Sequence, residues 1–244
     1  MPVCYDCLMA NPSRPYTTLF LLQSVDGKIS TGDTDERDFD KDLPHLVGIK
    51  EGLHQYYEIE QQTDLFSLIT GRVMAKVGVN TNPLKSTKQI PMSFVVVDNK
   101  PHLNKHGVEF LAHKFSKLLI VTTDETHPAY SLQNLYSNVF ILHYDHGIDF
   151  ADLFKKLKTQ HGADHMTIQS GGELNALLLR AGLIDQVLVV IAPCLIGGRT
   201  TPTLIDGEPL NTSDDLAEIR PLKLKSCKEL KDSYLRLEYE VMID

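Results

Sequence analysis

Two points in the sequence place glycine between an apolar segment and a helical pattern, where bare backbone could bind an anion. The stronger is Gly171-Gly172, which follows the apolar segment 166–170 and precedes a stripe formed by Leu174, Leu177 and its neighbours. A helix that begins here exposes unpaired amide hydrogens and the positive end of its dipole. Glycines would let a phosphate approach those amides, which is typical of a dinucleotide pyrophosphate site. A tight turn made for packing alone is the alternative.

The second glycine junction is Gly71-Arg72, after the apolar segment 66–70. Open α/β sheets bind ligands at the carboxyl ends of their strands, which is where this glycine would lie. Arg72 could pair with a phosphate and would suit a nicotinamide cofactor phosphorylated at the 2′ position. An arginine solvated on a helix surface is the competing interpretation. The sequence has neither G-x-G-x-x-G nor G-x-x-x-x-G-K-[ST], which disfavours a standard Rossmann site and a P-loop.

The third chemical element is Ser24-Val25-Asp26-Gly27-Lys28, at the end of a strongly apolar segment. Asp-Gly chiefly forms turns. An acid at the end of a buried strand and beside a pocket can also have its pKa raised and donate a proton. We therefore take Asp26 as the candidate general acid.

Metal binding is not predicted. Cys4 and Cys7 have the spacing of half a zinc site, but the other two cysteines, Cys194 and Cys227, are isolated and distant. His102 and His106 are four residues apart without an evident third ligand.

Composition narrows the function classes. The chain has 244 residues with 24 basic and 32 acidic side chains, so its net charge of −8 argues against nucleic acid as a partner. No apolar run approaches the roughly 20 residues that cross a bilayer, and the amino terminus does not resemble a secretory signal, so no membrane association is expected. Reduced thiols and these absences favour a cytoplasmic location.

The elements that must position these residues alternate between strand and helix patterns. Strands are predicted at 16–25, 66–70, 94–97, 118–122, 139–142, 166–170 and 186–192, with an antiparallel pair at 222–228 and 234–241. Helices are predicted at 44–62, 71–76, 150–160 and 172–181, and around Val108, Leu111, Ala112 and Phe115, while 30–42 resembles an exposed loop. This order predicts an α/β fold around a largely parallel sheet. No linker or repeat is evident, so we expect a tail, 1–13, and one domain, 14–244.

Taken in order, four segments resemble the reductase domain of bacterial riboflavin biosynthesis, the RibD C-terminal family. They are S-x-D-G-K-I at 24–29, T-G-R at 70–72, S-G-G with its leucines at 170–178, and G-L-I-D at 182–185 followed by A-P-x-L-I-G-G at 192–198. The resemblance implies a dihydrofolate reductase-like fold: three α/β/α layers, a mixed, mostly parallel sheet and a C-terminal antiparallel hairpin.

The resemblance also implies an activity. In this family NADPH gives hydride to the sugar C1′ of a ribosylaminopyrimidine phosphate, and a homodimer is expected. The matching motifs assign cofactor binding to Thr70, Gly71, Arg72, Val73, Ser170, Gly171, Gly172, Glu173 and Leu174. They assign catalysis to Asp26 and substrate binding to Ser24, Gln169 and Lys85.

Two departures leave the substrate open. Gln169 stands where many relatives have glutamate, so an acid–base role there is lost. The segment 80–88 lacks an arginine for a substrate phosphate, although Lys85 or Lys88 could replace it as a point charge. The alternatives are a reductase of the same fold acting on another substrate, such as a dihydrofolate-like pterin, and a non-catalytic nucleotide-binding protein.

Overall fold

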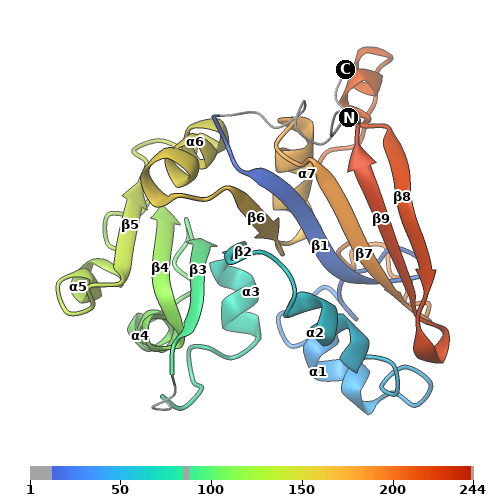
Figure 1. Ribbon diagram of the computed structural model, residues 1–244, viewed down its shortest axis with the longest axis horizontal. Coiled ribbons are helices and arrows are strands. Elements are labelled where there is room, and N and C mark those ends of the chain that lie inside the picture. The colour runs from blue at the N-terminus through green and yellow to red at the C-terminus, as the bar shows by residue number, and fades with distance from the viewer. Residues whose placement is uncertain (1–12, 85–87, 243–244) are drawn as a thin grey trace, which may run out of the picture.

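The computed structural model describes residues 13–84 and 88–242, whose strands form one nine-stranded sheet (Figure 1). Its spatial order is β5-β4-β3-β2-β6-β1-β7-β9-β8. The strands are β1 (Tyr16–Ser24), β2 (Phe66–Thr70), β3 (Ile90–Val97), β4 (Phe115–Thr122), β5 (Val139–His143), β6 (His165–Ile168), β7 (Gln186–Ala192), β8 (Leu222–Glu229) and β9 (Leu235–Val241).

Seven strands, β1 to β7, run parallel, and β9 pairs antiparallel with both β7 and β8. The predicted mixed, mostly parallel sheet with a C-terminal antiparallel hairpin is therefore confirmed. Because the carboxyl ends of parallel strands meet at one edge, the segments that follow β2, β3 and β6 are brought together. These segments carry both glycine junctions.

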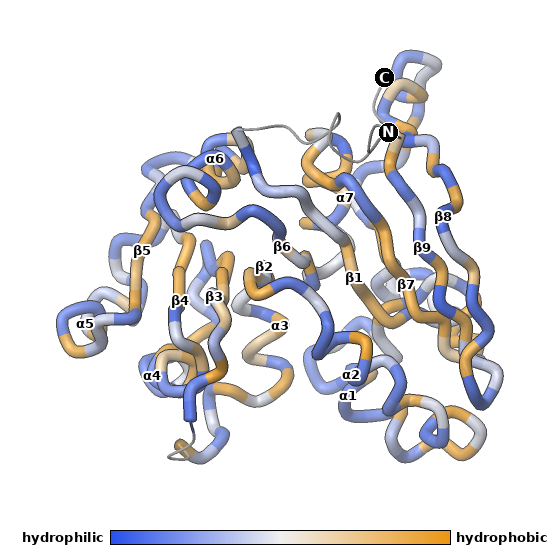
Figure 2. Tube along the Cα trace, in the orientation of Figure 1, coloured by the Kyte–Doolittle hydropathy of each residue, from blue (hydrophilic) through white to orange (hydrophobic). Residues whose placement is uncertain are grey.

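Helices cover both faces of this sheet, which gives the expected three layers (Figure 1). The α-helices are α1 (Phe39–Asp42), α2 (His54–Glu60), α3 (Gly71–Lys76), α4 (Lys105–Lys114), α5 (Tyr130–Gln133), α6 (Phe150–His161) and α7 (Gly172–Arg180). Short 3₁₀ helices lie at Leu43–His45, Asp214–Glu218 and Lys231–Ser233. Figure 2 shows apolar residues along β4, β5 and β7, whereas β8 and β9 mix apolar with hydrophilic residues.

Successive strand residues point to opposite faces, so a central strand such as β1 or β2 contributes side chains to two cores. Leu68 and Val95 pack with α6 and α7 on one face. On the other face, Ile69 and Val96 pack with α3 and α4, whereas Phe20 belongs to a separate core with α1 and α2. The cavity described below lies between these last two cores.

Asp185, in the G-L-I-D segment, joins the start of β1 to β7. Both of its oxygens accept from the Arg14 guanidinium at 2.7 Å, and Oδ2 also accepts from the Thr17 amide at 2.8 Å. A nearly buried, bidentate ion pair of this kind fixes strand register. The motif is therefore structural at this position.

The predicted helix at 44–62 is wrong in its first half. The chain forms only the 3₁₀ turn Leu43–His45 and then irregular turns before α2 begins at His54. Gly48 has φ +87, which interrupts a right-handed helix. Gly52 packs so tightly that an added Cβ would lie 2.6 Å from the Tyr234 ring.

Three smaller predictions also need correction. The expected loop at 30–42 contains α1, because Phe39 is buried in the core with α2. Phe115 does not extend α4; it begins β4 and stacks on Phe94 with ring centroids 4.2 Å apart. On α7, Leu177 is exposed rather than buried, and Asn175 takes the inward position.

Candidate functional site

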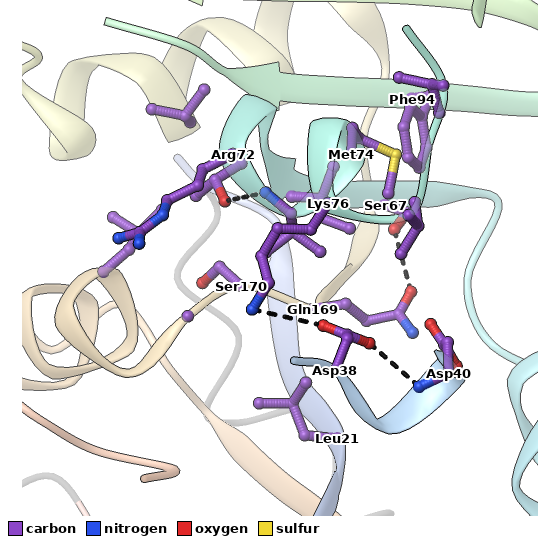
Figure 3. Close-up of a pocket in the computed structure, with 18 of the residues that line it drawn as sticks. Leu21, Asp38, Asp40, Ser67, Arg72, Met74, Lys76, Phe94, Gln169 and Ser170 are labelled. Atoms are coloured by element: carbon purple, nitrogen blue, oxygen red, sulfur yellow. Dashed lines mark hydrogen bonds and ion pairs between the residues drawn. The ribbon is translucent and has the colours of Figure 1, made fainter. Parts of the chain in front are cut away.

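A cavity of about 1280 Å³ runs along the carboxyl ends of the parallel strands. Its walls come from β2 and β3, from α1, α2 and α3, and from the segment between β6 and α7. Figure 3 shows Arg72 and Ser170 toward one side of this cavity and Asp40, Gln169 and Ser67 toward the other. Both glycine junctions thus reach the same space, as the sequence predicts.

The junction before α7 presents open backbone to the cavity. Gly171 is the N-cap of α7, is extended (φ −77, ψ 161) and supplies no side-chain acceptor to the first turn. A Cβ added at Gly171 would meet no atom within 4 Å. Residues 170–174 all line the cavity. Unpaired amides at a helix start, with open space before them, fit a diphosphate.

Gly172 has a different reason to be glycine. Its added Cβ would lie 2.2 Å from Asp206 Oδ2 and 2.4 Å from the Thr203 carbonyl oxygen. Asn175 fastens the same loop by donating to the Leu204 carbonyl at 2.8 Å. The two glycines therefore lack a side chain for different reasons: Gly171 faces open space, and Gly172 is required by packing, although Gly172 also lines the cavity.

The buried hydroxyl of Ser170 donates to Asn175 Oδ1 at 2.5 Å. That hydrogen bond ties the residue before the cap to the second turn of α7. The contribution of Ser170 to the site is thus to hold the junction in place.

The junction between β2 and α3 also places a glycine at the start of a helix, but here a side chain caps the helix and the glycine is closely packed. Thr70 caps α3 by accepting from the Val73 amide, and Thr70, Arg72 and Val73 line the cavity. Gly71 does not line it, because its added Cβ would lie 2.3 Å from the carboxylate of Asp98. Glycine is therefore required at this position by close packing on Asp98, and cofactor binding by Gly71 stays a prediction.

Arg72 lies at the rim of the cavity, where it pairs with Asp35 at 2.9 Å. Both side chains are more than half exposed. The interpretation of Arg72 as a solvated surface arginine therefore describes its position well. A cofactor phosphate would have to compete with Asp35 for this cation.

Asp98, directly after β3, is a fully buried carboxylate. It accepts from His127 Nε2 at 3.1 Å, from the amides of His102 and Leu103, and it contacts His102 Nδ1 at 3.1 Å. The Ala129 amide donates to His127 Nδ1, which fixes the proton of this imidazole on Nε2. Burial raises the pKa of Asp98, but the lowering of this pKa by the hydrogen bonds is larger than that increase. The net pKa shift is therefore downward.

Asp26 is exposed and does not line the cavity. Its carboxylate accepts from Ser24 Oγ at 2.6 Å and from the amides of Gly197 at 2.6 Å and Ile196 at 3.1 Å. Those hydrogen bonds lower the pKa of Asp26 to about 2. The expectation of a raised pKa is wrong, because the carboxylate is solvated and stabilised as an anion. Asp26 instead fastens the I-G-G turn after β7.

Ser24 is also placed differently from the prediction. Its side chain is buried, donates to Asp26 and accepts from the Lys28 amide at 2.9 Å, and it does not line the cavity. These contacts give Ser24 a structural part in the turn rather than a contact with substrate.

Asp26→Asn should therefore change acid stability rather than cofactor affinity. Because the folded-state pKa is depressed, the stabilising effect of this carboxylate is present above pH 3.8 and is lost as the pH falls toward about 2. Thermal unfolding between pH 5 and pH 2 should show a smaller acid-induced loss in the variant than in the wild type. An acid-induced loss of stability as large in the variant as in the wild type would contradict this assignment.

The other side of the cavity carries acids that the sequence did not single out. Gln169 lines the cavity and donates from Nε2 to Glu60 Oε1 at 2.6 Å, and substrate binding by it stays a prediction. Tyr57 donates to Asp40 Oδ1 at 2.6 Å. Glu60 lies four residues after the buried Tyr56 and therefore on the same face of the helix. This spacing was the signal in the sequence that could have identified Glu60. Asp40 had none, because its segment resembled an exposed loop.

No helix in residues 13–84 or 88–242 is both long and apolar enough to span a bilayer. Within the same residues, no group of three or more His, Cys, Asp or Glu side chains is arranged to hold a metal ion. Cys4, Cys7 and Lys85 lie outside the described residues.

The chain is similar to several known proteins. It is 25% identical to the 2,5-diamino-6-ribosylamino-4(3H)-pyrimidinone 5′-phosphate reductase of Methanothermobacter thermautotrophicus over 240 residues, which cover 93% of this chain and 99% of that protein. It is 25% identical to the riboflavin biosynthesis protein RibD of Actinobacillus pleuropneumoniae, covering 94% of this chain but only 57% of that one.

Solved structures agree on the fold. RibD of Acinetobacter baumannii superposes with a TM-score of 0.65 at 17% identity, covering 94% of this chain and 58% of that one. The chain thus spans less than two thirds of either RibD protein. The model of the RibD C-terminal domain matches residues 15–235. The chain therefore belongs to the RibD C-terminal domain family, and its fold is dihydrofolate reductase-like.

Proposed function

We propose that this chain is an NADPH-dependent reductase of riboflavin biosynthesis, which converts the ribosylamino group of a pyrimidine 5′-phosphate into a ribitylamino group. The observation that carries the proposal is that two features line the same cavity. They are the backbone amides at the start of α7 and the side chain of Gln169, which is hydrogen-bonded to Glu60. The name of the Methanothermobacter relative, which this chain covers almost completely, supports the same reaction.

The reaction requires one hydride and one proton. Opening of the sugar ring breaks the bond between C1′ and the ring oxygen, moves the proton of the amino nitrogen to that oxygen as a hydroxyl, and leaves C1′ double-bonded to the nitrogen. The reduced nicotinamide supplies a hydride to C1′, and a proton goes to the nitrogen. The part of this chain is to bind both molecules, align them and exclude water.

Within this proposal the backbone of Gly171, Gly172, Glu173 and Leu174 binds the pyrophosphate. Thr70, Arg72 and Val73 contact another part of the cofactor from the opposite junction. Gln169 lies beside the substrate, and substrate binding by Lys85 stays a prediction. Asp26 is not assigned the proton transfer, because its carboxylate is outside the cavity and strongly ionised.

Cofactor binding and turnover test the proposal in two steps. NADPH at a hundred times its Kd should stabilise the chain by about 2.7 kcal/mol in thermal unfolding. The ribosylaminopyrimidine phosphate should then cause loss of the absorbance of reduced nicotinamide. Binding without oxidation would favour a non-catalytic nucleotide-binding protein, and oxidation with dihydrofolate alone would favour the pterin reductase.

Two further features are part of the proposal. We expect a homodimer, which sedimentation of the purified chain would reveal. The edge strand β8 is consistent with an assembly, because it exposes Leu222 and Leu224 beside unpaired backbone groups. The predicted cytoplasmic location stays a prediction.

A further inference from the structure

Lys76 brings an ammonium group into the interior of the cavity. It lies in the last turn of α3, one helical turn after Arg72, and its side chain is 13% exposed. In the part of the chain that the structure describes, its only ion pair is with Asp38, whose Oδ2 lies 3.6 Å from Nζ. That separation is too long for a direct hydrogen bond. The three N–H donors of this ammonium are therefore free for a ligand.

Asp38 presents a base beside this acid. Its Oδ1 accepts from the Asp40 amide at 3.0 Å and caps α1, which leaves Oδ2 toward Lys76. Its side chain is 16% exposed, and both residues line the cavity. In Figure 3, Lys76 extends from α3 toward Asp38, and the pair lies between Ser170 and Gln169 in this view. Holding an ion pair largely away from solvent without hydrogen bonds is costly, so the pair calls for a function.

One other ion pair among the described residues has both members in the cavity wall, and it is His102 with Asp98. Asp98 is fully buried and already accepts from the His127 imidazole and from backbone amides. Its oxygens are thus occupied. Asp38 Oδ2 and Lys76 Nζ, by contrast, make no hydrogen bond within the described residues. The Lys76–Asp38 pair is therefore the one that can exchange protons with a substrate.

Opening of the sugar ring requires an acid and a base side by side. The nitrogen that loses a proton and the ring oxygen that gains one are bonded to the same carbon, C1′. A positioned acid supplies the oxygen as its bond to C1′ breaks, and a positioned base takes the proton from the nitrogen as the C1′=N bond forms. Lys76 and Asp38 offer these two functions next to each other, in the cavity where cofactor and substrate are proposed to meet.

We propose that Lys76 is the general acid and Asp38 the general base of ring opening. Lys76 gives a proton to the ring oxygen and Asp38 takes one from the nitrogen, so the pair becomes an amine and a carboxylic acid. When hydride reaches C1′, the electron pair of the C=N bond moves to the nitrogen, which takes the proton back from Asp38. Lys76 regains a proton from solvent, the one proton that the reduction consumes. The inference rests on the proposed function and names its proton-transfer residues.

Ring opening can be measured without the cofactor. The open-chain imine recloses on either face of C1′, so it interconverts the two anomers of the ribosylaminopyrimidine phosphate, which NMR exchange spectroscopy follows. The wild type should accelerate this exchange over buffer, and Lys76→Met and Asp38→Asn should each lower the acceleration by about a hundredfold or more. Asp38→Asn keeps the cap of α1, because asparagine caps helices as well as aspartate does.

Lys155→Met and Asp149→Asn are the matched controls. Lys155 is exposed on α6, Asp149 caps that helix, and neither lines the cavity. Both controls should exchange the anomers at the wild-type rate. Stabilisation of each variant by NADPH in thermal unfolding verifies that it is folded.

Lys76→Arg distinguishes proton donation from charge alone. Arginine keeps the positive charge but does not release its proton, so this variant should bind the substrate and fail to accelerate the exchange. Wild-type exchange in Lys76→Arg, Lys76→Met or Asp38→Asn, or no acceleration by the wild type itself, would overturn the inference.

Oxidation of NADPH separates this inference from the proposed function. Anomer exchange that depends on Lys76 and Asp38, with no oxidation of NADPH by the wild type, would support the inference and contradict the reductase. Oxidation of NADPH at the wild-type rate by Lys76→Met and Asp38→Asn would support the reductase and overturn the inference.

Discussion

Gly171→Asp should weaken NADPH binding by about a hundredfold or more, which is about 2.8 kcal/mol at 1.4 kcal/mol per tenfold change. The new carboxylate would occupy the open space before the first turn of α7, where the diphosphate is proposed to bind. The negative charges of the carboxylate and the diphosphate would repel each other strongly in a partly desolvated site. Isothermal titration of NADPH into the folded variant measures the effect.

The design of this variant follows from the surroundings of the two glycines. The backbone of Gly171 is extended, with negative φ and no neighbouring atom within 4 Å of an added Cβ, so the fold tolerates the side chain. Gly172→Asp would instead collide with Asp206 and confuse misfolding with loss of binding. Gly147→Asp is the control, since it adds the same charge at an exposed, unobstructed glycine. Equal NADPH affinity in Gly171→Asp and Gly147→Asp would contradict the amide cradle.

Asp98→Ala should lower the free energy of unfolding by about 3–5 kcal/mol, the cost of breaking a buried charged network by removal of one partner. The substitution leaves the buried Nε2–H of His127 and the Leu103 amide without their acceptor. Urea unfolding at neutral pH measures the loss. Asp145→Ala is the control, because its side chain is 83% exposed and should change stability by less than about 0.5 kcal/mol.

The contribution of Asp98 should also depend on pH. Its folded-state pKa is lowered, so the stabilisation is complete above the ordinary value of 3.8 and disappears as the pH falls below it. The difference in stability between the wild type and Asp98→Ala should therefore shrink in acid. A difference that is constant from pH 7 to pH 3 would contradict an ionised Asp98.

Periodicity in the sequence predicted the sheet well because each strand carries its own signal. Most of the parallel strands are short apolar runs that end up buried, so local pattern and final environment coincide there. The hairpin alternates in sequence, but Leu222 and Leu224 of β8 are exposed. The prediction of a helix at 44–62 was wrong in its first half. Some of the apolar residues there pack into the core from irregular turns and not from a helix. The contact between Gly52 and Tyr234 joins segments far apart in the sequence, and no local pattern reports it.

The candidate site was predictable in place but not in detail. The sequence located both junctions and Gln169 correctly at one cavity. It could not distinguish Gly171, which faces open space, from Gly71 and Gly172. At those two positions Asp98 and Asp206 occupy the space that a side chain would need. The same limit applies to Asp26, whose pKa is set by amides of the turn after β7. Each of these outcomes depends on a tertiary neighbour.

Transfer of deuterium tests the central claim most directly. The chain is incubated with the 2,5-diamino-6-ribosylamino-4(3H)-pyrimidinone 5′-phosphate and with NADPH deuterated at the transferable position of its nicotinamide ring. The account predicts a ribitylamino product that carries one deuterium at C1′, detected by mass spectrometry and located by NMR. An unreduced ribosylamino compound, or a reduced product without deuterium at C1′, would contradict it.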